Sequence, residues 1–152
     1  MNADNKIRQN LDNVKNYGWQ TLDLKNCGLK AIPREIFNYT ELVSIDLSND
    51  LFCDEEHKNK IKVVPPEISK LKNLKRLNLS NNQLEEISEN LSSLHKLTYL
   101  NLCNNNLTDI SGKIANMSSL SEICLEDNPF DMLPPEIVAR GISAIRNFYK
   151  EL

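Results

Sequence analysis

The segment LFCDEEHKNK, residues 51–60, combines several residue types that bind metals or transfer protons. Cys53 and His57 are four positions apart and enclose three consecutive carboxylates. Thiolates, imidazoles and carboxylates are the ligands of zinc, so the segment could supply half of a zinc site. A contact with a partner and a solvated loop are the other readings. The chain offers no second ligand pair at suitable spacing, its other histidine being His95, so we predict a solvated loop.

No other combination of residues is typical of an active site. The cysteines at positions 27, 53, 103 and 124 form no CxxC pair and match no zinc-finger spacing. The sequence has four glycines and no GxxxxGK[ST] phosphate-binding loop. No Cys/His or Ser/His/Asp arrangement indicates a nucleophile. We therefore predict no catalytic residue, no cofactor and no metal ligand, and a protein that is not an enzyme.

Composition points to one ordinary globular domain. The chain has 152 residues, 26% of them charged, and a net charge of −3. Lysines alternate with acids and form no basic stripe, which argues against a nucleic acid partner. The N-terminus lacks the apolar core of a signal peptide, and no apolar run approaches the roughly 18 residues of a membrane helix. We expect a cytoplasmic monomer that does not insert into a membrane.

A repeat of 23 residues determines where the polar residues lie. LKRLNLSNNQLEEISENLSSLHK (74–96) aligns position by position with LTYLNLCNNNLTDISGKIANMSS (97–119). The pattern, LxxLxLxxNxLxx(I/L)PxxIxxLxx, resembles the leucine-rich repeat. The predicted repeats span residues 19–41, 42–73, 74–96, 97–119 and 120–139.

The two halves of the repeat have different periodicities. Alternating apolar residues in LxL predict a strand with one buried face, and the following Asn can satisfy backbone groups at a buried turn. PxxIxxL has helical spacing, and Ser88 and Ser111, which replace the proline, can act as N-caps. One repeat cannot bury its apolar face alone. The fold class is therefore α/β: a right-handed, curved leucine-rich repeat solenoid with a parallel sheet on its concave face and short helices or 3-10 turns on its convex face.

The second repeat is nine residues longer than the 23-residue repeats. Counting along the template, Asp50 takes the Asn position there, as Cys27 does in the first repeat. The next template residue, Ile61, arrives nine positions late, so we place an insertion at 51–60. Deleting residues 51–59 should then leave stability nearly unchanged, because loop length has a small energetic effect.

Amphipathic stripes flank the repeats and predict helical caps at 1–18 and 140–152. The N-terminal stripe should cover the edge beside Trp19. Docking of a partner on these helices is the alternative. The stripes consist of Ile7, Leu11, Val14 and Tyr17 at one end, and of Ile142, Ile145, Phe148 and Leu152 at the other.

Both ends also resemble one group of repeat proteins. LDNVKNYGWQTLDLKNCGLKAIPREI (11–36) and LEDNPFDMLPPEIVARGISAIRNFYKEL (125–152) are similar to segments of the repeat domains that precede the Ras-like GTPase in bacterial Roco-type proteins. Related repeats occur in Ras-group scaffolds. The resemblance implies a scaffold that binds another protein without catalysis. It leaves a second possibility, a regulatory repeat domain of a larger signalling enzyme.

Side chains that point away from the core of each LxL strand should form a concave partner-binding surface. Arg76 and Tyr99 are the only large side chains at these positions, and the C-terminal end is acidic. A merely solvated sheet face is the alternative. Cys103 and Cys124 should lie about 8 Å apart on neighbouring strands, too far for an unstrained disulfide. The predicted binding residues are Thr21, Asp23, Lys25, Ser44, Asp46, Ser48, Arg76, Asn78, Ser80, Tyr99, Asn101, Cys103, Glu122, Cys124, Glu126 and Asp127.

Overall fold

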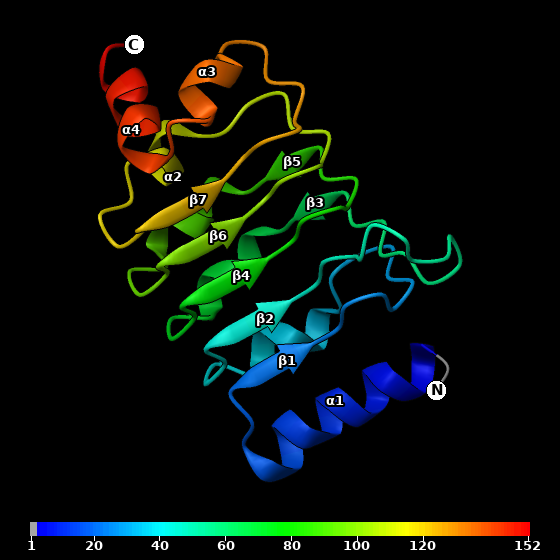
Figure 1. Ribbon diagram of the computed structural model, residues 1–152. Coiled ribbons are helices and arrows are strands. Elements are labelled where there is room, and N and C mark those ends of the chain that lie inside the picture. The colour runs from blue at the N-terminus through cyan, green and yellow to red at the C-terminus, as the bar shows by residue number, and fades with distance from the viewer. Residues whose placement is uncertain (1–2) are drawn as a thin grey trace.

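A parallel sheet of five short strands forms one side of the molecule. In this computed structural model, which describes residues 3–152, the strands lie side by side in chain order (Figure 1). Each begins 23 residues after its predecessor, except that β4, starting at 76, follows β2, starting at 44, by 32 residues. The predicted solenoid is therefore confirmed. The strands are β1 (Thr21–Asp23), β2 (Ser44–Asp46), β4 (Arg76–Asn78), β6 (Tyr99–Asn101) and β7 (Glu122–Cys124).

Short helices and turns line the opposite, convex side. The hydroxyls of Ser88 and Ser111 accept hydrogen bonds from the backbone N–H two residues on, at 3.3 and 3.2 Å, which confirms both as N-caps. The template prolines 33, 65 and 134 also occupy the cap position, directly before the first turn. The convex elements are η1 (Arg34–Asn38), β3 (Val63–Val64), η2 (Pro66–Lys70), β5 (Glu86–Ile87), η3 (Glu89–Ser93), α2 (Gly112–Ala115) and α3 (Pro135–Val138).

The core is one continuous stack of apolar layers. The central residues of adjacent strands pair in register, as Leu77 does with Leu100. Both side chains are fully buried because each repeat covers the apolar side of its neighbour. Equivalent residues of the convex turns, such as Ile68 and Leu91, are buried in the same way. The sheet is therefore held rigidly from behind, and its concave side chains are fixed in rows.

The N-terminal helix closes one end of the stack only in part. Helix α1 (Ala3–Tyr17) buries Leu11 and Val14, but Tyr17 is 75% exposed and Trp19 is 48% exposed. The prediction that Tyr17 belongs to the stripe that covers this edge is wrong, and Trp19 beside the edge is left exposed. Tyr17 is the last helical residue, and Gly18, with φ +66°, turns the chain away from the helix directly after it. Residues 1 and 2 of the predicted cap lie outside the described residues.

The C-terminal helix packs on the other end. Helix α4 (Ile142–Lys150) follows Gly141, whose φ is +75°, and contacts α2 and α3. Ile145 is fully buried there. Leu152, which we expected in the same stripe, lies beyond the helix and is exposed. Within residues 3–152, none of the helices combines the length and the apolarity that crossing a bilayer requires.

The second repeat differs from the prediction at its Asn position. Asn59, not Asp50, fills that position and is only 1% exposed. Its amide donates to the carbonyls of Leu24 and Leu47 at 2.9 and 3.0 Å, and its oxygen accepts the N–H of Leu29 at 2.9 Å. Asn82, Asn105 and Asn128 make the equivalent three bonds in later repeats.

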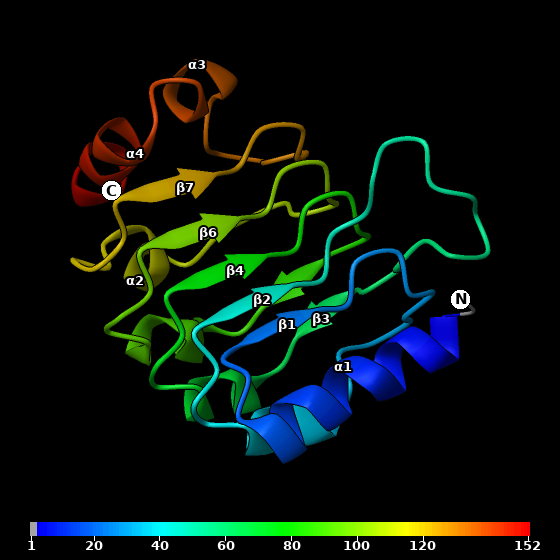
Figure 2. The same ribbon diagram turned by 60° about the horizontal axis from the view of Figure 1, so that its bottom comes forward.

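Asp50 instead lies at the surface. Its carboxylate pairs with the Lys25 ammonium at 2.6 Å and accepts from the Asn26 amide at 2.7 Å. The extra nine residues are therefore 50–58, because they precede the Asn position rather than follow it. Figure 2 shows this insertion projecting beyond the carboxyl end of β2. The predicted placement of the insertion at 51–60 is wrong because it includes the core residue Asn59, so deleting 51–59 is now expected to be destabilising.

Candidate protein-binding surface

The first residues of the five strands form a row across the concave face. Strand pairing places Arg76 beside Tyr99 and Tyr99 beside Glu122. We call this set the first row. It runs from small hydroxyls through a cation and an aromatic ring to an acid. Its members are Thr21, Ser44, Arg76, Tyr99 and Glu122.

Arg76 and Tyr99 form a preorganised pair at the centre of the first row. The guanidinium carbon of Arg76 lies 4.1 Å from the centroid of the Tyr99 ring, within cation–π range. The Asn101 amide donates to the Tyr99 hydroxyl at 3.2 Å. Tyr99 is partly buried, whereas Arg76 is exposed. The pair thus offers a large side-chain surface that loses little rotamer freedom on binding.

The last residues of the five strands form a second row: Asp23, Asp46, Asn78, Asn101 and Cys124. Four of them have a structural role that sequence reasoning missed. In Asp46, Asn78 and Asn101 a side-chain oxygen accepts the backbone N–H two residues further on, at 2.9 to 3.1 Å, and Asp23 does the same for Lys25. These bonds hold the chain where each strand ends. The sequence does contain a signal for this role, because an Asp or Asn ends the strand in four of the five repeats. This row is therefore less free to bind a partner than the first.

Two serines that follow the second row by two residues, Ser48 and Ser80, are buried. Ser48 and Ser80 donate their hydroxyl hydrogens back to Asp46 and Asn78, at 2.5 and 3.0 Å. Their predicted direct contact with a partner does not fit this position, since a short side chain held against the sheet offers little surface. Lys25 is partly exposed and Asp127 is exposed at opposite ends of the concave face.

Cys103, Cys124 and Glu126 converge near the C-terminal end of the sheet. One ligand atom of each residue lies within 4.8 Å of the other two, and the Cys103 thiol donates to Glu126 at 3.0 Å. Burial, and then the hydrogen bond to Glu126, raise the pKa of Cys103 to about 12. Sequence reasoning placed the cysteines about 8 Å apart from backbone spacing alone and did not join them to Glu126. The signal was present, since Glu126 follows Cys103 by one repeat of 23 residues.

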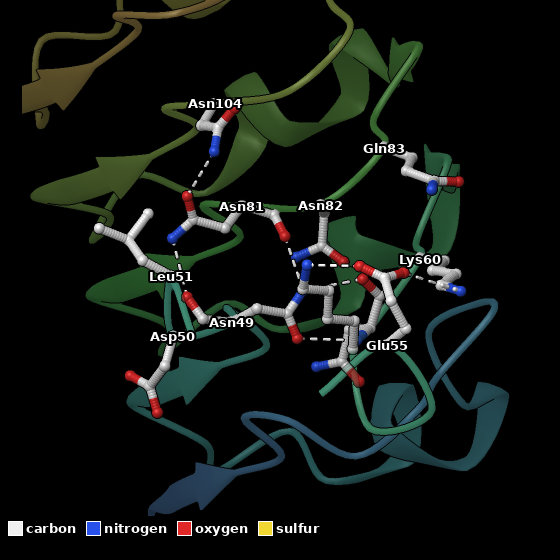
Figure 3. Close-up of a pocket in the computed structure, with 11 residues that line it drawn as sticks. Asn49, Asp50, Leu51, Glu55, Lys60, Asn81, Asn82, Gln83 and Asn104 are labelled. Carbon is white, nitrogen blue, oxygen red and sulfur yellow. Dashed lines mark hydrogen bonds and ion pairs between the residues drawn. The ribbon is translucent and has the colours of Figure 1, made fainter. Parts of the chain in front are cut away.

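The insertion builds a polar pocket beside the concave face. Figure 3 shows Asn49, Asn81 and Asn104 in a line. The Asn81 side-chain oxygen accepts from the Asn104 amide at 2.7 Å, and Asn49 and Asn81 each donate a side-chain amide hydrogen to the backbone carbonyl of the other. A cavity of about 220 Å³ separates this line from the insertion. Glu55 closes it and pairs with Lys58 at 2.6 Å and with Lys60 at 3.5 Å.

Most charged groups of the segment 51–60 lie in such pairs. Glu56 lies 3.6 Å from the His57 ring, and the Cys53 thiol donates to the Asp54 carbonyl. Among residues 3–152, Cys103, Cys124 and Glu126 form the one cluster of three potential metal ligands, and it lies outside this segment. The start of the insertion instead exposes the apolar side chains of Leu51 and Phe52.

A model of the leucine-rich repeats of leucine-rich repeat and WD repeat-containing protein 1 matches residues 39–139, which are 101 of 152 residues. This chain belongs to the leucine-rich repeat family. The volume-regulated anion channel subunit LRRC8D of Rattus norvegicus is 35% identical, over 43% of this chain and 10% of that protein.

Solved structures of leucine-rich repeat proteins have the same fold. A Leptospira interrogans LRR protein, 30% identical, matches 84% of this chain and 36% of its own, with a TM-score of 0.59. An internalin from Listeria monocytogenes, 24% identical, matches 80% of this chain and 32% of its own, with a TM-score of 0.60. The leucine-rich repeat chain thus spans about a third of these structures. These matches do not confirm the resemblance to Roco-type proteins.

Proposed function

We propose that this chain is a non-catalytic scaffold module that binds another protein through the first row of its concave face. The cation–π pair of Arg76 and Tyr99 carries this proposal. Arginine and tyrosine are over-represented among residues whose truncation weakens protein complexes most. Here both are fixed by the sheet at the middle of a curved surface, where a partner would bury them.

The acidic residues of the concave face support a partner that carries positive charge. Glu122, Glu126 and Asp127 are exposed at the C-terminal end of the concave face. Such a cluster attracts a basic patch and raises its association rate at low salt. We therefore propose a protein partner with an apolar or aromatic contact for Tyr99 and basic residues beside it, met in the cytoplasm by a monomer.

We also propose the division into an N-terminal cap (1–18), five repeats (19–139) and a C-terminal cap (140–152). Helix α1 contacts β1, and α4 contacts α2 and α3, so both ends of the stack have a helix against them. Exposed repeat ends would leave apolar surface in water, and covering them is the ordinary task of such helices.

A regulatory repeat domain of a larger signalling enzyme, such as a Roco-type GTPase, is the second candidate. The similarity of both ends to the repeat domains of that group favours it, and so does the fact that relatives extend well beyond the matched part. The length of the gene and the neighbouring reading frame distinguish the two. A GTPase encoded in the same frame would establish the second.

Tyr99→Ala is expected to weaken partner binding by roughly 1–3 kcal/mol, the range of interface hot spots. The loss should appear in calorimetric titrations with a partner isolated by affinity capture. Thermal unfolding should change little, because Tyr99 lies on the concave surface and the leucine layer behind it is untouched. Glu126→Lys should mainly slow association at low ionic strength.

Two control variants test whether the partner binds the concave face rather than the ends or the convex side. Tyr17→Ala removes the same side chain from α1, where it is exposed, and Lys113→Glu reverses a charge on the convex side. Both should bind normally. Normal binding by Tyr99→Ala together with loss in either control would move the interface to the ends or the convex side.

A further inference from the structure

We propose that Cys103, Cys124 and Glu126 form a binding site for one thiophilic divalent cation, Zn²⁺, on the concave face. This inference does not require the proposed partner, although it gives Glu126 a second role beside the one in the acidic cluster. It concerns the isolated chain and requires only the three side chains that β6, β7 and the turns after them bring together.

The geometry of the cluster fits a tetrahedral ion. Zn–S bonds of about 2.3 Å place two coordinated sulfur atoms about 3.8 Å apart. The ligand atoms of Cys103, Cys124 and Glu126 already lie within 4.8 Å of one another, so small side-chain rotations are enough. Cys124 lies in β7, and Cys103 and Glu126 follow β6 and β7 by two residues each, so paired strands of the five-stranded sheet hold the backbone that carries the ligands.

The ligand types favour zinc over the abundant hard cations. Thiolate sulfur binds Zn²⁺ strongly, whereas Mg²⁺ and Ca²⁺ select oxygen ligands. Glu122 adds a carboxylate 3.8 Å from the Cys124 sulfur and can take the fourth position, which water would otherwise fill. On binding, each thiol releases its proton to solvent, and two S–Zn bonds and one O–Zn bond form.

The surroundings lack a competing positive charge. Across residues 3–152, neither Glu122 nor Glu126 forms an ion pair with a lysine or arginine. Negative groups and two thiols are thus held together near the surface without a cation among them. A divalent ion would offset most of the negative charge of the carboxylate and of the thiolates that it creates.

A disulfide between the two cysteines fits the backbone less well. Cys124 pairs with Asn101, and Cys103 lies two residues further along the chain, beyond the end of β6. A strand spacing of about 4.8 Å and a rise of about 3.3 Å per residue place the two Cα atoms roughly 8 Å apart. Disulfides seldom exceed about 6.8 Å, so bridging would distort the sheet. A metal ion spans the extra distance.

Titration of tag-free, reduced protein with Co²⁺ tests the site. We expect one Co²⁺ per chain, a sulfur-to-cobalt charge-transfer absorption, intense tetrahedral d–d bands and stoichiometric displacement by Zn²⁺. Cys103→Ser and Cys124→Ser should each lower affinity by more than the roughly 10–100-fold that loss of an outer-shell group produces. Glu126→Gln should weaken binding by a smaller factor.

Cys53→Ser is the matched control, because Cys53 is a partly exposed cysteine in the insertion, away from the cluster. It should leave the cobalt spectrum unchanged. Circular dichroism checks that each variant folds. If a serine variant does not fold, the cobalt affinity of Glu126→Gln tests the site instead. Absence of a charge-transfer band in the wild-type chain, or its survival in both Cys103→Ser and Cys124→Ser, would overturn the proposal.

Discussion

Deleting residues 51–59 should lower the free energy of unfolding by roughly 3 kcal/mol more than deleting residues 50–58. Both deletions remove nine residues and restore the 23-residue spacing. Their products differ in one side chain, Asp50 in the first and Asn59 in the second. A carboxylate accepts hydrogen bonds but cannot donate to the buried carbonyls of Leu24 and Leu47, which Asn59 satisfies.

Urea unfolding monitored by circular dichroism measures the difference. Both deletions lose the bond between Gly28 N–H and the His57 carbonyl, so that loss cancels in the comparison. In the full-length chain, Asn59→Asp should be strongly destabilising and Asp50→Asn nearly neutral. Equal midpoints for the two deletions would show that Asp50 can fill the core position after all.

The second large effect is expected in the apolar stack. Leu100→Ala should destabilise the fold by roughly 2–5 kcal/mol, because it removes a fully buried side chain between two repeats and leaves a cavity. Leu79→Asp should be worse, since a buried carboxylate would have no partner.

Leu51→Ala makes the same chemical change in the insertion, where Leu51 is 71% exposed. It should alter stability by no more than about 0.5 kcal/mol. Thermal and urea unfolding of the two alanine variants give the comparison. Similar midpoints would contradict the inward orientation of Leu100.

Periodicity alone predicted most of the fold. Leucines two positions apart must face one side of a strand, and a fixed 23-residue spacing must place these strands side by side. The same counting failed at Asp50, because an insertion shifts the template and sequence alone does not say on which side of the Asn position it falls. The hydrogen bonds of Asn59 decide this.

The sequence predicted which residues lie on the concave surface, but it did not predict what each side chain does there. The template identifies Asn78 and Ser80 as facing away from the core, yet their side chains bond locally and stabilise the strand end. The stacking of Arg76 on Tyr99 and the convergence of Cys103 on Glu126 depend on rotamers that no spacing rule specifies. The predicted burial of Tyr17 was wrong for a different reason, since the turn at Gly18 exposes the end of its helix.

Protein binding at the first row can be tested by mapping amide chemical shifts of the labelled chain as the captured partner is added. The largest changes should fall in β4, β6 and β7, around Arg76, Tyr99 and Glu122, with the convex turns unaffected. Changes confined to α1, α4 or η1 to η3, with these strands unperturbed, would contradict binding at the concave face.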